Sequence, residues 1–206
     1  MVALFGIPAA ARPADMGELL AGVGLRLVTP PSPATDFDLP RLDGGRGSLS
    51  DYRGNWVVLT FWATWCGPCR MEMPSLERLH RERADQGLSV LGVSIDEDQA
   101  PIGPFVQQLG LTFPMFWDER REVGAAYRAS SIPLSYLIDP TGRIVALSRG
   151  ARDWSDLGGM LEAALAVVPP DPGAQAVYAS GPVELPSTLN PPTAELALSD
   201  PEPQVG

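Results

Sequence analysis

The sequence predicts an α/β fold with a mixed central sheet flanked by helices, and three observations support that class. Apolar runs rich in β-branched residues, typical of strands buried on both faces, alternate with segments in which apolar residues have helical spacing. The first such strand, a helix and a second strand follow one another directly, which implies a parallel crossover. Toward the C-terminus two apolar runs are joined only by a tight turn, which implies an antiparallel hairpin.

The first predicted elements form a strand–helix–strand unit. The run Trp56–Trp62 is almost continuously apolar and is predicted to be a central strand. Apolar residues then recur every third position from Met73, with charged residues between them, which predicts a helix that ends at Gly87. The run Leu88–Ile95 is predicted to be a second buried strand.

The later elements complete the domain. Helices are predicted around Pro104–Leu109 and at Glu119–Tyr127. The apolar runs Leu134–Ile138 and Ile144–Ser148 flank the sequence DPTG, whose proline and glycine suit a tight turn. A final helix is predicted at Trp154–Val168.

Composition divides the chain into three regions. Residues 1–33 form an N-terminal extension with a short amphipathic segment that can become a helix, and residues 34–168 form the α/β domain. Residues 169–206 contain nine prolines, five acidic residues and no arginine. Such a segment buries too little apolar surface to offset its ordering entropy, so we expect an acidic, disordered tail.

Charge and hydropathy limit the partners. The net charge of −10 argues against a nucleic-acid partner, because phosphate binding requires a clustered positive face. No apolar run approaches the roughly 20 residues that cross a bilayer. The first residues lack the basic region of a secretory signal, and Pro8 interrupts their apolar stretch. The sequence therefore leaves the compartment and any membrane association open, and we expect a monomer.

The only two cysteines, Cys66 and Cys69, stand where the central strand meets the helix. The first sulfur should lie at the helix N-terminus, where unpaired N–H groups and the helix dipole stabilise a thiolate. We therefore expect Cys66 to be an exposed, acidic nucleophile. Cys69, one turn later, should be more buried and should attack the mixed disulfide between Cys66 and a substrate. Gly67 permits close backbone approach, and Pro68 suits the first helical turn.

Three other readings of the pair have less support. A zinc site requires four ligands, and beyond the cysteines the sequence offers only His80. A permanent structural disulfide that closes so short a loop removes little chain entropy. An inert reduced pair is the third alternative. We expect no metal and no cofactor other than a redox-active disulfide between Cys66 and Cys69.

With these motifs in place, the chain resembles the thioredoxin-fold proteins of the TlpA/ResA type, relatives of the AhpC/TSA group of redoxins. The resemblance covers about residues 34–150 and rests on DFDLPRLDG, LSDYRGNWVVL, WCGPC, VSIDED, LGLTFPMFWD and SIPLSYLIDPTGRIV. It implies a thioredoxin-like fold and a thiol:disulfide oxidoreductase that reduces protein disulfides with electrons from an upstream donor. In this family such reduction occurs most often in the cell envelope, for example in cytochrome c maturation or thiol homeostasis.

The resemblance also implies roles for individual residues. Ile132–Pro133 matches the family's cis-proline step, which faces the cysteines and offers a backbone to the substrate. Glu72 matches the family's active-site acid, which raises thiol pKa values and accepts the proton of Cys69; the alternative is an ordinary solvated helical glutamate. The expected substrate-binding residues are Trp65, Gly67, Pro68, Ile132 and Pro133.

Thr60 and the pair Leu134–Ser135 depart from the family pattern. Thioredoxins carry a buried aspartate at the position of Thr60, six residues before the first cysteine. A hydroxyl cannot act as a general base at neutral pH, so any such role falls on Glu72 or water. Leu134 and Ser135 replace polar residues often found after the cis-proline.

Two other functions are alternatives. A thiol peroxidase of the AhpC/TSA type requires a threonine three residues before its reactive cysteine, where this chain has Ala63, with Thr64 one residue too close. A Sco-like metal or redox binder uses a C-x-x-x-C pair and a histidine in a distant loop. Here the spacing is C-x-x-C, and His80 falls on the predicted helix.

Overall fold

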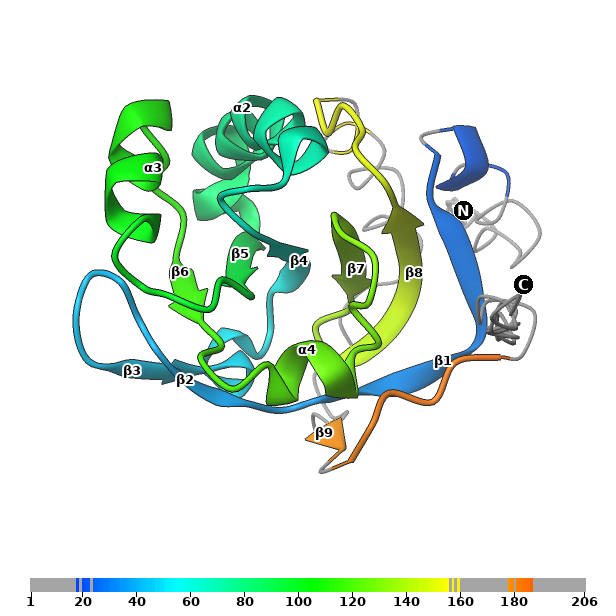
Figure 1. Cartoon of the computed structure of the whole chain (residues 1–206). Helices are drawn as coiled ribbons and strands as arrows, with labels where there is room; N and C mark the ends of the chain where they lie inside the picture. The colour runs from blue at the N-terminus through cyan, green and yellow to red at the C-terminus, as the bar shows by residue number, and fades with distance from the viewer. Residues whose placement is uncertain are drawn as a thin grey trace, which may run out of the picture.

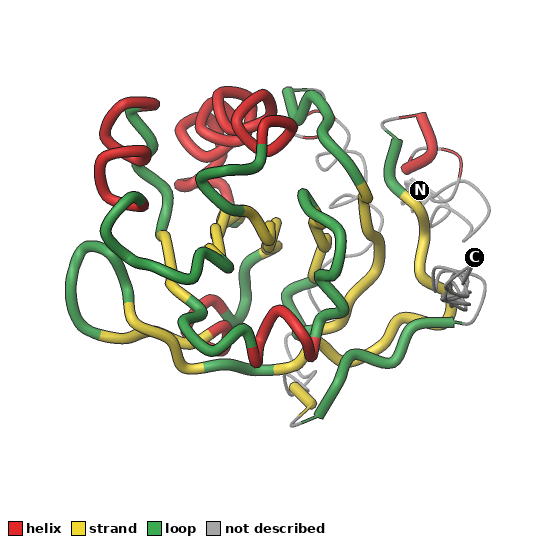
Figure 2. The backbone as a smooth tube through the Cα atoms, viewed as in Figure 1, coloured by secondary structure: helices red, strands yellow, loops and turns green. Residues whose placement is uncertain are grey.

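The computed structural model describes residues 24–155, 178–179 and 181–186, together with residues 18, 20–22, 157 and 159. Seven strands form one sheet in the order β6–β5–β4–β7–β8–β1–β9, and two short strands pair separately as β2–β3 (Figures 1 and 2). The strands are β1 (Arg26–Thr35), β2 (Asp38–Pro40), β3 (Arg46–Ser48), β4 (Trp56–Trp62), β5 (Leu88–Ser94), β6 (Met115–Trp117), β7 (Leu134–Ile138), β8 (Arg143–Arg149) and β9 (Tyr178–Ala179). The helices are α2 (Gly67–Arg83), α3 (Ile102–Leu109) and α4 (Glu122–Ala126), with short 3-10 helices at Leu49–Tyr52 and Ala84–Gln86.

Helices lie on both faces of the sheet. β4, β5 and β6 are parallel neighbours, and α2 and α3 connect them in turn. Because both crossovers advance in the same direction along the sheet and such crossovers are right-handed, α2 and α3 share one face. Figure 1 shows them together, with α4 on the opposite side of the sheet. The predicted mixed sheet flanked by helices is confirmed.

The central strand β4 leads directly to the cysteines. All seven of its residues are buried, as expected for a continuously apolar strand that is covered on both faces. It pairs in parallel with β5 and antiparallel with β7, so it lies inside the sheet. Its bounds agree with the predicted range Trp56–Trp62, and β5 ends at Ser94, one residue earlier than predicted. The chain therefore leaves the middle of the sheet just before Cys66.

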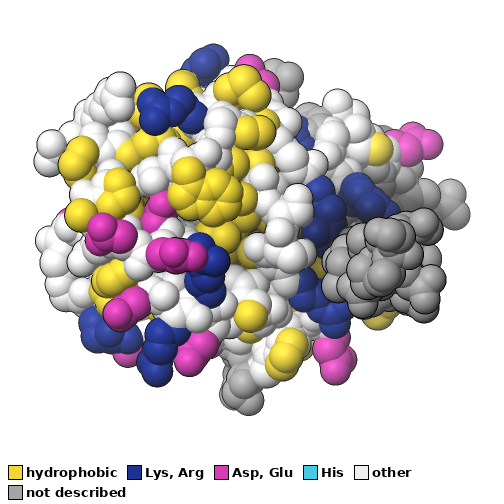
Figure 3. Space-filling view, viewed as in Figure 1, with side chains coloured by type: hydrophobic (Ala, Val, Ile, Leu, Met, Phe, Trp, Pro, Cys, Tyr) yellow, Lys and Arg dark blue, Asp and Glu magenta, His cyan; other side chains and the backbone are white. Residues whose placement is uncertain are grey.

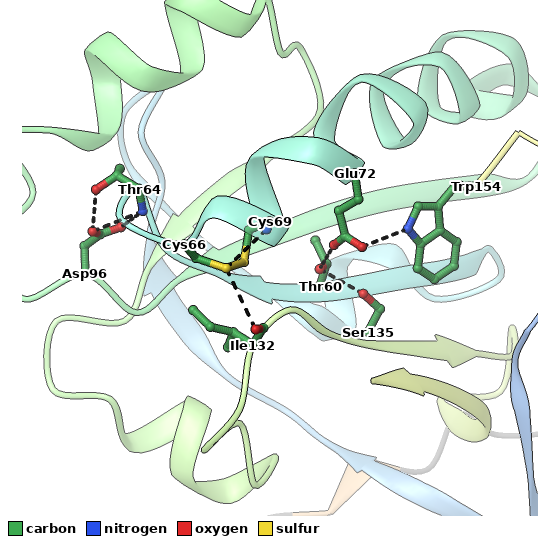
Figure 4. Close-up of a disulfide and its surroundings, with 9 residues drawn as sticks. All are labelled: Thr60, Thr64, Cys66, Cys69, Glu72, Asp96, Ile132, Ser135 and Trp154. Carbon is green, nitrogen blue, oxygen red and sulfur yellow. Dashed lines mark hydrogen bonds between the residues drawn. A yellow bond between two sulfur atoms is a disulfide. The ribbon is translucent and has the colours of Figure 1, made fainter. Parts of the chain in front are cut away.

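The later elements occur in the predicted order with shifted ends. β7 and β8 form the predicted hairpin. α3 begins at Ile102, two residues before its predicted start, because Pro104 in the first turn requires no backbone acceptor. α4 is shorter than predicted and begins at Glu122, directly after Arg121 in the left-handed conformation with a φ of 55°. Together these elements place the loop between α4 and β7 beside the cysteines (Figure 4).

β1 crosses the boundary expected between the N-terminal extension and the domain. It begins at Arg26 and pairs antiparallel with β8, so the boundary expected at residue 34 falls inside a strand of the main sheet. Its sequence, RLVTPPSPAT, contains prolines, which lack the N–H group that a sheet ladder requires. The register accordingly shifts between Leu27 and Ser32. The same prolines interrupt the pattern by which a strand is recognised in the sequence.

Part of the C-terminal tail is ordered against the domain, contrary to the expected disorder. β9 pairs in parallel with the end of β1. The N–H of Val183 donates a hydrogen bond of 2.8 Å to the carbonyl of Ala126, at the end of α4. Val183 is fully buried and Leu185 is nearly so. These two apolar residues stand between prolines in the sequence, and the sheet edge and α4 supply the partners that the tail lacks by itself.

Several expectations fall on residues outside the described part of the chain. They concern most of the short helix expected within residues 1–33, most of the final helix expected at Trp154–Val168, and residues 169–177, 180 and 187–206 of the tail. Among the residues that the structure describes, no helix is long and apolar enough to cross a membrane.

Candidate active site

Cys66 and Cys69 form a disulfide at the N-terminal end of α2 (Figure 4). Cys66 is the N-cap residue, and its sulfur accepts a hydrogen bond of 3.2 Å from the N–H of Cys69. Pro68 occupies the first turn, where its missing N–H is not required. The predicted strand-to-helix context of the pair is therefore present, and the first sulfur faces the free N–H groups of the helix.

The two cysteines differ in exposure in the predicted order, but Cys66 is more covered than expected. Cys69 is fully buried, whereas Cys66 is 5% exposed in the disulfide. The reason is the loop before β7, because the carbonyl oxygen of Ile132 lies 3.8 Å from the Cys66 sulfur. Little of Cys66 is therefore open to a partner in the disulfide form.

The loop opposite the disulfide contains the cis peptide bond that the resemblance implies, between Ile132 and Pro133. Pro133 is buried and its carbonyl accepts a hydrogen bond of 2.9 Å from the N–H of Gly150, which anchors the loop to the end of β8. A second cis bond, Thr29–Pro30 in β1, has no counterpart in the sequence expectations.

Glu72 lies on α2 and is 1% exposed, so the alternative of an ordinary solvated helical glutamate is wrong. Its two carboxylate oxygens have different partners. Oε1 accepts from the hydroxyl of Thr60 at 3.3 Å, and Oε2 accepts from the indole Nε1 of Trp154 at 3.4 Å (Figure 4). Burial raises the pKa of Glu72 to about 7, and the hydrogen bonds from Trp154, the Arg152 backbone and Thr60 act in the opposite direction.

The hydroxyl of Thr60 also accepts a hydrogen bond from a second hydroxyl. Thr60 and Ser135 are directly opposite each other on β4 and β7, and the Ser135 hydroxyl donates to Thr60 Oγ1 at 2.9 Å. Both side chains are buried. Two of the positions that depart from the family pattern thus form one cross-strand pair, in which Thr60 contacts Glu72 and Ser135 contacts Thr60.

Asp96 holds the segment before the first cysteine. Its buried carboxylate accepts hydrogen bonds from the N–H and hydroxyl of Thr64 and from the hydroxyl of Ser94. The hydroxyl of Thr64 is therefore engaged with Asp96, and Ala63 is buried at the position where a peroxidase of this family requires threonine. No feature of this segment favours the peroxidase alternative.

Sequence reasoning missed Trp154, Ser135 and Asp96 as neighbours of the site. Trp154 was expected only as the start of a helix, and Asp96 only as part of a motif. Trp154 is 82 positions from Glu72, and Asp96 is 32 positions from Thr64. No local pattern reports contacts over such separations. The pairing of β4 with β5 and β7, and of β7 with β8, brings these residues together.

His80 cannot complete a metal site with the cysteines. It lies eleven residues past Cys69 on the same helix, which is about 16 Å along the axis. It packs edge-on against Phe113, and burial lowers the pKa of its imidazole. Within the described residues no three His, Cys, Asp or Glu side chains are grouped as metal ligands would be.

Apolar surface flanks the disulfide. Trp65 is 65% exposed and Met71 is 72% exposed, and they are the large hydrophobic side chains that the described surface leaves open. Gly67 and Pro68, between them in the sequence, are also exposed. Figure 3 shows hydrophobic side chains gathered in the middle of one face, with acidic and basic side chains around them.

Comparison with known proteins identifies relatives of this chain. The sequence model of the AhpC/TSA family matches residues 30–147. The thiol-disulfide oxidoreductase ResA of Geobacillus kaustophilus is 38% identical over 131 residues, which cover 64% of this chain and 75% of the relative. The ResA protein of Bacillus subtilis is 34% identical over 127 residues, with coverage of 62% and 71%.

Solved structures share the fold. A thiol:disulfide interchange protein of the thioredoxin family from Chlorobium tepidum has a TM-score of 0.59 and 26% identity, and the match covers 66% of this chain and 97% of that chain. The arrangement of β4, α2 and the antiparallel pair β7–β8 is therefore the thioredoxin-like fold that the sequence resemblance implies.

Burial of Glu72 predicts a pH dependence of stability that Glu72→Gln removes. The pKa of Glu72 rises from 4.5 to about 7 on folding, so between these values the folded state binds more protons than the unfolded state. Stability from this group is fully present below pH 4.5 and is lost as the pH rises through 7. At about 1.4 kcal/mol per pH unit, the wild type should lose about 3 kcal/mol relative to Glu72→Gln between pH 4.5 and 8.

Urea denaturation of both oxidised proteins across that range measures the difference. Contributions from other titrating groups, such as Asp118 and His80, are common to the two proteins and cancel. Parallel curves of unfolding free energy against pH would show that Glu72 is not held in a desolvating site.

Proposed function

The chain belongs to the AhpC/TSA family and is a thioredoxin-like thiol-disulfide oxidoreductase, and from this premise we propose that it reduces disulfide bonds of protein substrates. The observation that carries the proposal is the Cys66–Cys69 disulfide at the start of α2, opposite Ile132–Pro133. A sulfur at a helix N-terminus is the setting in which a thiolate is stabilised.

The first step is attack by Cys66. In the reduced protein its thiolate displaces one sulfur of the substrate disulfide, which leaves as a thiolate and takes up a proton. A mixed disulfide then joins Cys66 to the second substrate sulfur. The N–H of Cys69, which donates to the Cys66 sulfur at 3.2 Å, supports the negative charge before attack.

The second step releases the substrate. Cys69 transfers its thiol proton to the carboxylate of Glu72, and the resulting thiolate attacks Cys66. The Cys66–Cys69 bond forms, and the second substrate sulfur leaves and is protonated. A buried carboxyl group whose pKa is about 7 suits this role, because it can accept and return a proton near neutral pH. The substrate gains two electrons and two protons, and a separate dithiol donor must reduce the protein again.

The substrate surface is formed by residues around the disulfide. Trp65, Gly67 and Pro68 are exposed on one side of it, and Ile132 lies on the other. We propose that a substrate segment packs on the Trp65 ring while its backbone pairs with Ile132, next to Pro133. A single copy of the chain contains all of these residues, so we expect a monomer to be active.

Substitution of each cysteine tests their division of roles. Cys69→Ser should accumulate a mixed disulfide with substrate, because Cys66 still attacks and nothing resolves the product. Cys66→Ser is the matched control and should capture at least tenfold less, since the remaining sulfur is buried. Non-reducing electrophoresis with a disulfide-containing protein measures capture. Equal capture by the two variants would contradict the assignment of Cys66 as the nucleophile.

A protein that reduces its substrates should have a low reduction potential at the Cys66–Cys69 pair. The Gly-Pro dipeptide between the cysteines is that of thioredoxin, and we expect a reduction potential below about −220 mV. Equilibration with glutathione or dithiothreitol buffers, followed by thiol counting, measures it. A value near about −120 mV, that of a strong oxidant, would mean that the protein forms disulfides and does not reduce them.

A further inference from the structure

Trp154 is hydrogen-bonded to the turn of α2 that contains Glu72. It is fully buried in the irregular segment after β8 and lies outside the part of the chain that the family model matches. Its backbone N–H donates to the hydroxyl of Ser75 at 3.2 Å, and that hydroxyl donates to the carbonyl of Glu72 at 2.8 Å. Trp154 is thus placed by α2 itself.

The indole ring of Trp154 is held between two groups. Its Nε1 donates to Glu72 Oε2 at 3.4 Å, and the guanidinium of Arg152 lies over the ring, 4.7 Å from its centre. In Figure 4 the indole and the disulfide are drawn on opposite sides of Glu72. Trp154 is the strongest of the groups that oppose the effect of burial on the pKa of Glu72.

The chemistry of the indole decides where Glu72 carries its proton. An indole N–H is a donor and never an acceptor, so Oε2 of Glu72 accepts from it in both protonation states. Because the carbonyl oxygen of a neutral carboxyl group is a better acceptor than its hydroxyl oxygen, the indole favours protonation of Glu72 at Oε1. The partner of Oε1 is the Thr60 hydroxyl, which can donate to the carboxylate or accept from the acid. Ser135, on the far side of Thr60, can reverse its role in the same way.

We propose that Trp154 is a positioning residue that keeps Oε2 of Glu72 as an acceptor and directs proton uptake to Oε1. This role rests on the proposed function, in which Glu72 exchanges a proton with Cys69. The groups that face Glu72 from β4 and β7 are the hydroxyls of Thr60 and Ser135. The segment after β8 adds Arg152, whose backbone hydrogen bond and charge both act on the carboxylate. Arg78 and Asp153 line a pocket of about 330 Å³ that reaches Glu72.

Trp154→Phe tests the proposal, since it keeps an aromatic ring and removes the donor. Loss of a hydrogen bond to a charged group should raise the titration midpoint of Glu72 by about one pH unit, a tenfold change in acidity. The readout is the carboxyl infrared band that is absent in Glu72→Gln. Trp56→Phe is the matched control, because Trp56 is also buried but its Nε1 has no hydrogen-bond partner among the described residues. It should leave the midpoint unchanged.

The wild-type protein supplies a second measurement in case Trp154→Phe does not fold. The indole Nε1–H resonance of Trp154 should titrate with the midpoint of Glu72, and the titration should vanish in Glu72→Gln. The Trp56 resonance should not follow. A Trp154 resonance that is insensitive to pH from 5 to 9, or an unmoved midpoint in folded Trp154→Phe, would overturn the proposal.

Activity links the positioning role to the reaction. In Trp154→Phe the acid limb of the pH profile for substrate reduction should move upward by the same amount as the Glu72 midpoint. If the Glu72 midpoint moves in Trp154→Phe but the acid limb of the activity profile does not, the link between Trp154 and proton transfer is wrong. The spectroscopic titrations require no substrate, so they remain informative even if Cys69→Ser captures none and the proposed function fails.

Discussion

The carboxyl group of Glu72 is buried beneath the active-site helix, and its surroundings come from three segments far apart in the sequence. Thr60 lies on β4, Ser135 lies behind it on β7, and Trp154 follows β8. Desolvation makes ionisation of this carboxyl group costly, and the hydrogen bonds from Trp154 and Thr60 each offset part of that cost. The order of strands β4, β7 and β8 in the sheet brings these side chains together. The environment of the Glu72 carboxyl group therefore depends on the β7–β8 hairpin as well as on α2.

The same helix controls the charge on the cysteines. Its N-terminus stabilises a thiolate at Cys66, whereas an ionised Glu72 nearby on α2 disfavours further negative charge. In this account the negative charge of the site lies on different groups at different steps. The Cys66 thiolate carries it before attack. In the second step the Glu72 carboxylate loses its negative charge when it accepts the proton of Cys69. A surface acid would remain ionised throughout and could not alternate in this way.

The sequence was most informative where local pattern and structure coincide. The continuous apolar runs predicted β4 and β5, the turn residues predicted the hairpin, and the strand-to-helix junction predicted the order of burial of the two sulfurs. β1 was not predicted because its prolines interrupt the strand pattern, and β9 was not predicted because the tail around it has the composition of a disordered segment. The side chains around Glu72 were not predictable, because a tryptophan or serine that donates to a distant carboxylate has no periodicity of its own. Thr60 was identified as a departure, but its partner Ser135 became evident only from the strand register.

The measurement that tests this account most directly is the ultraviolet titration of the Cys66 thiolate in reduced wild-type protein and in reduced Glu72→Gln. If Glu72 is coupled to the cysteines, the wild-type curve should contain an inflection near pH 7 from ionisation of the acid. In Glu72→Gln that inflection should disappear and the pKa of Cys66 should fall, because a negative neighbour has been removed. Superimposable curves would contradict the account and would leave Glu72 as a buried acid without influence on the thiols.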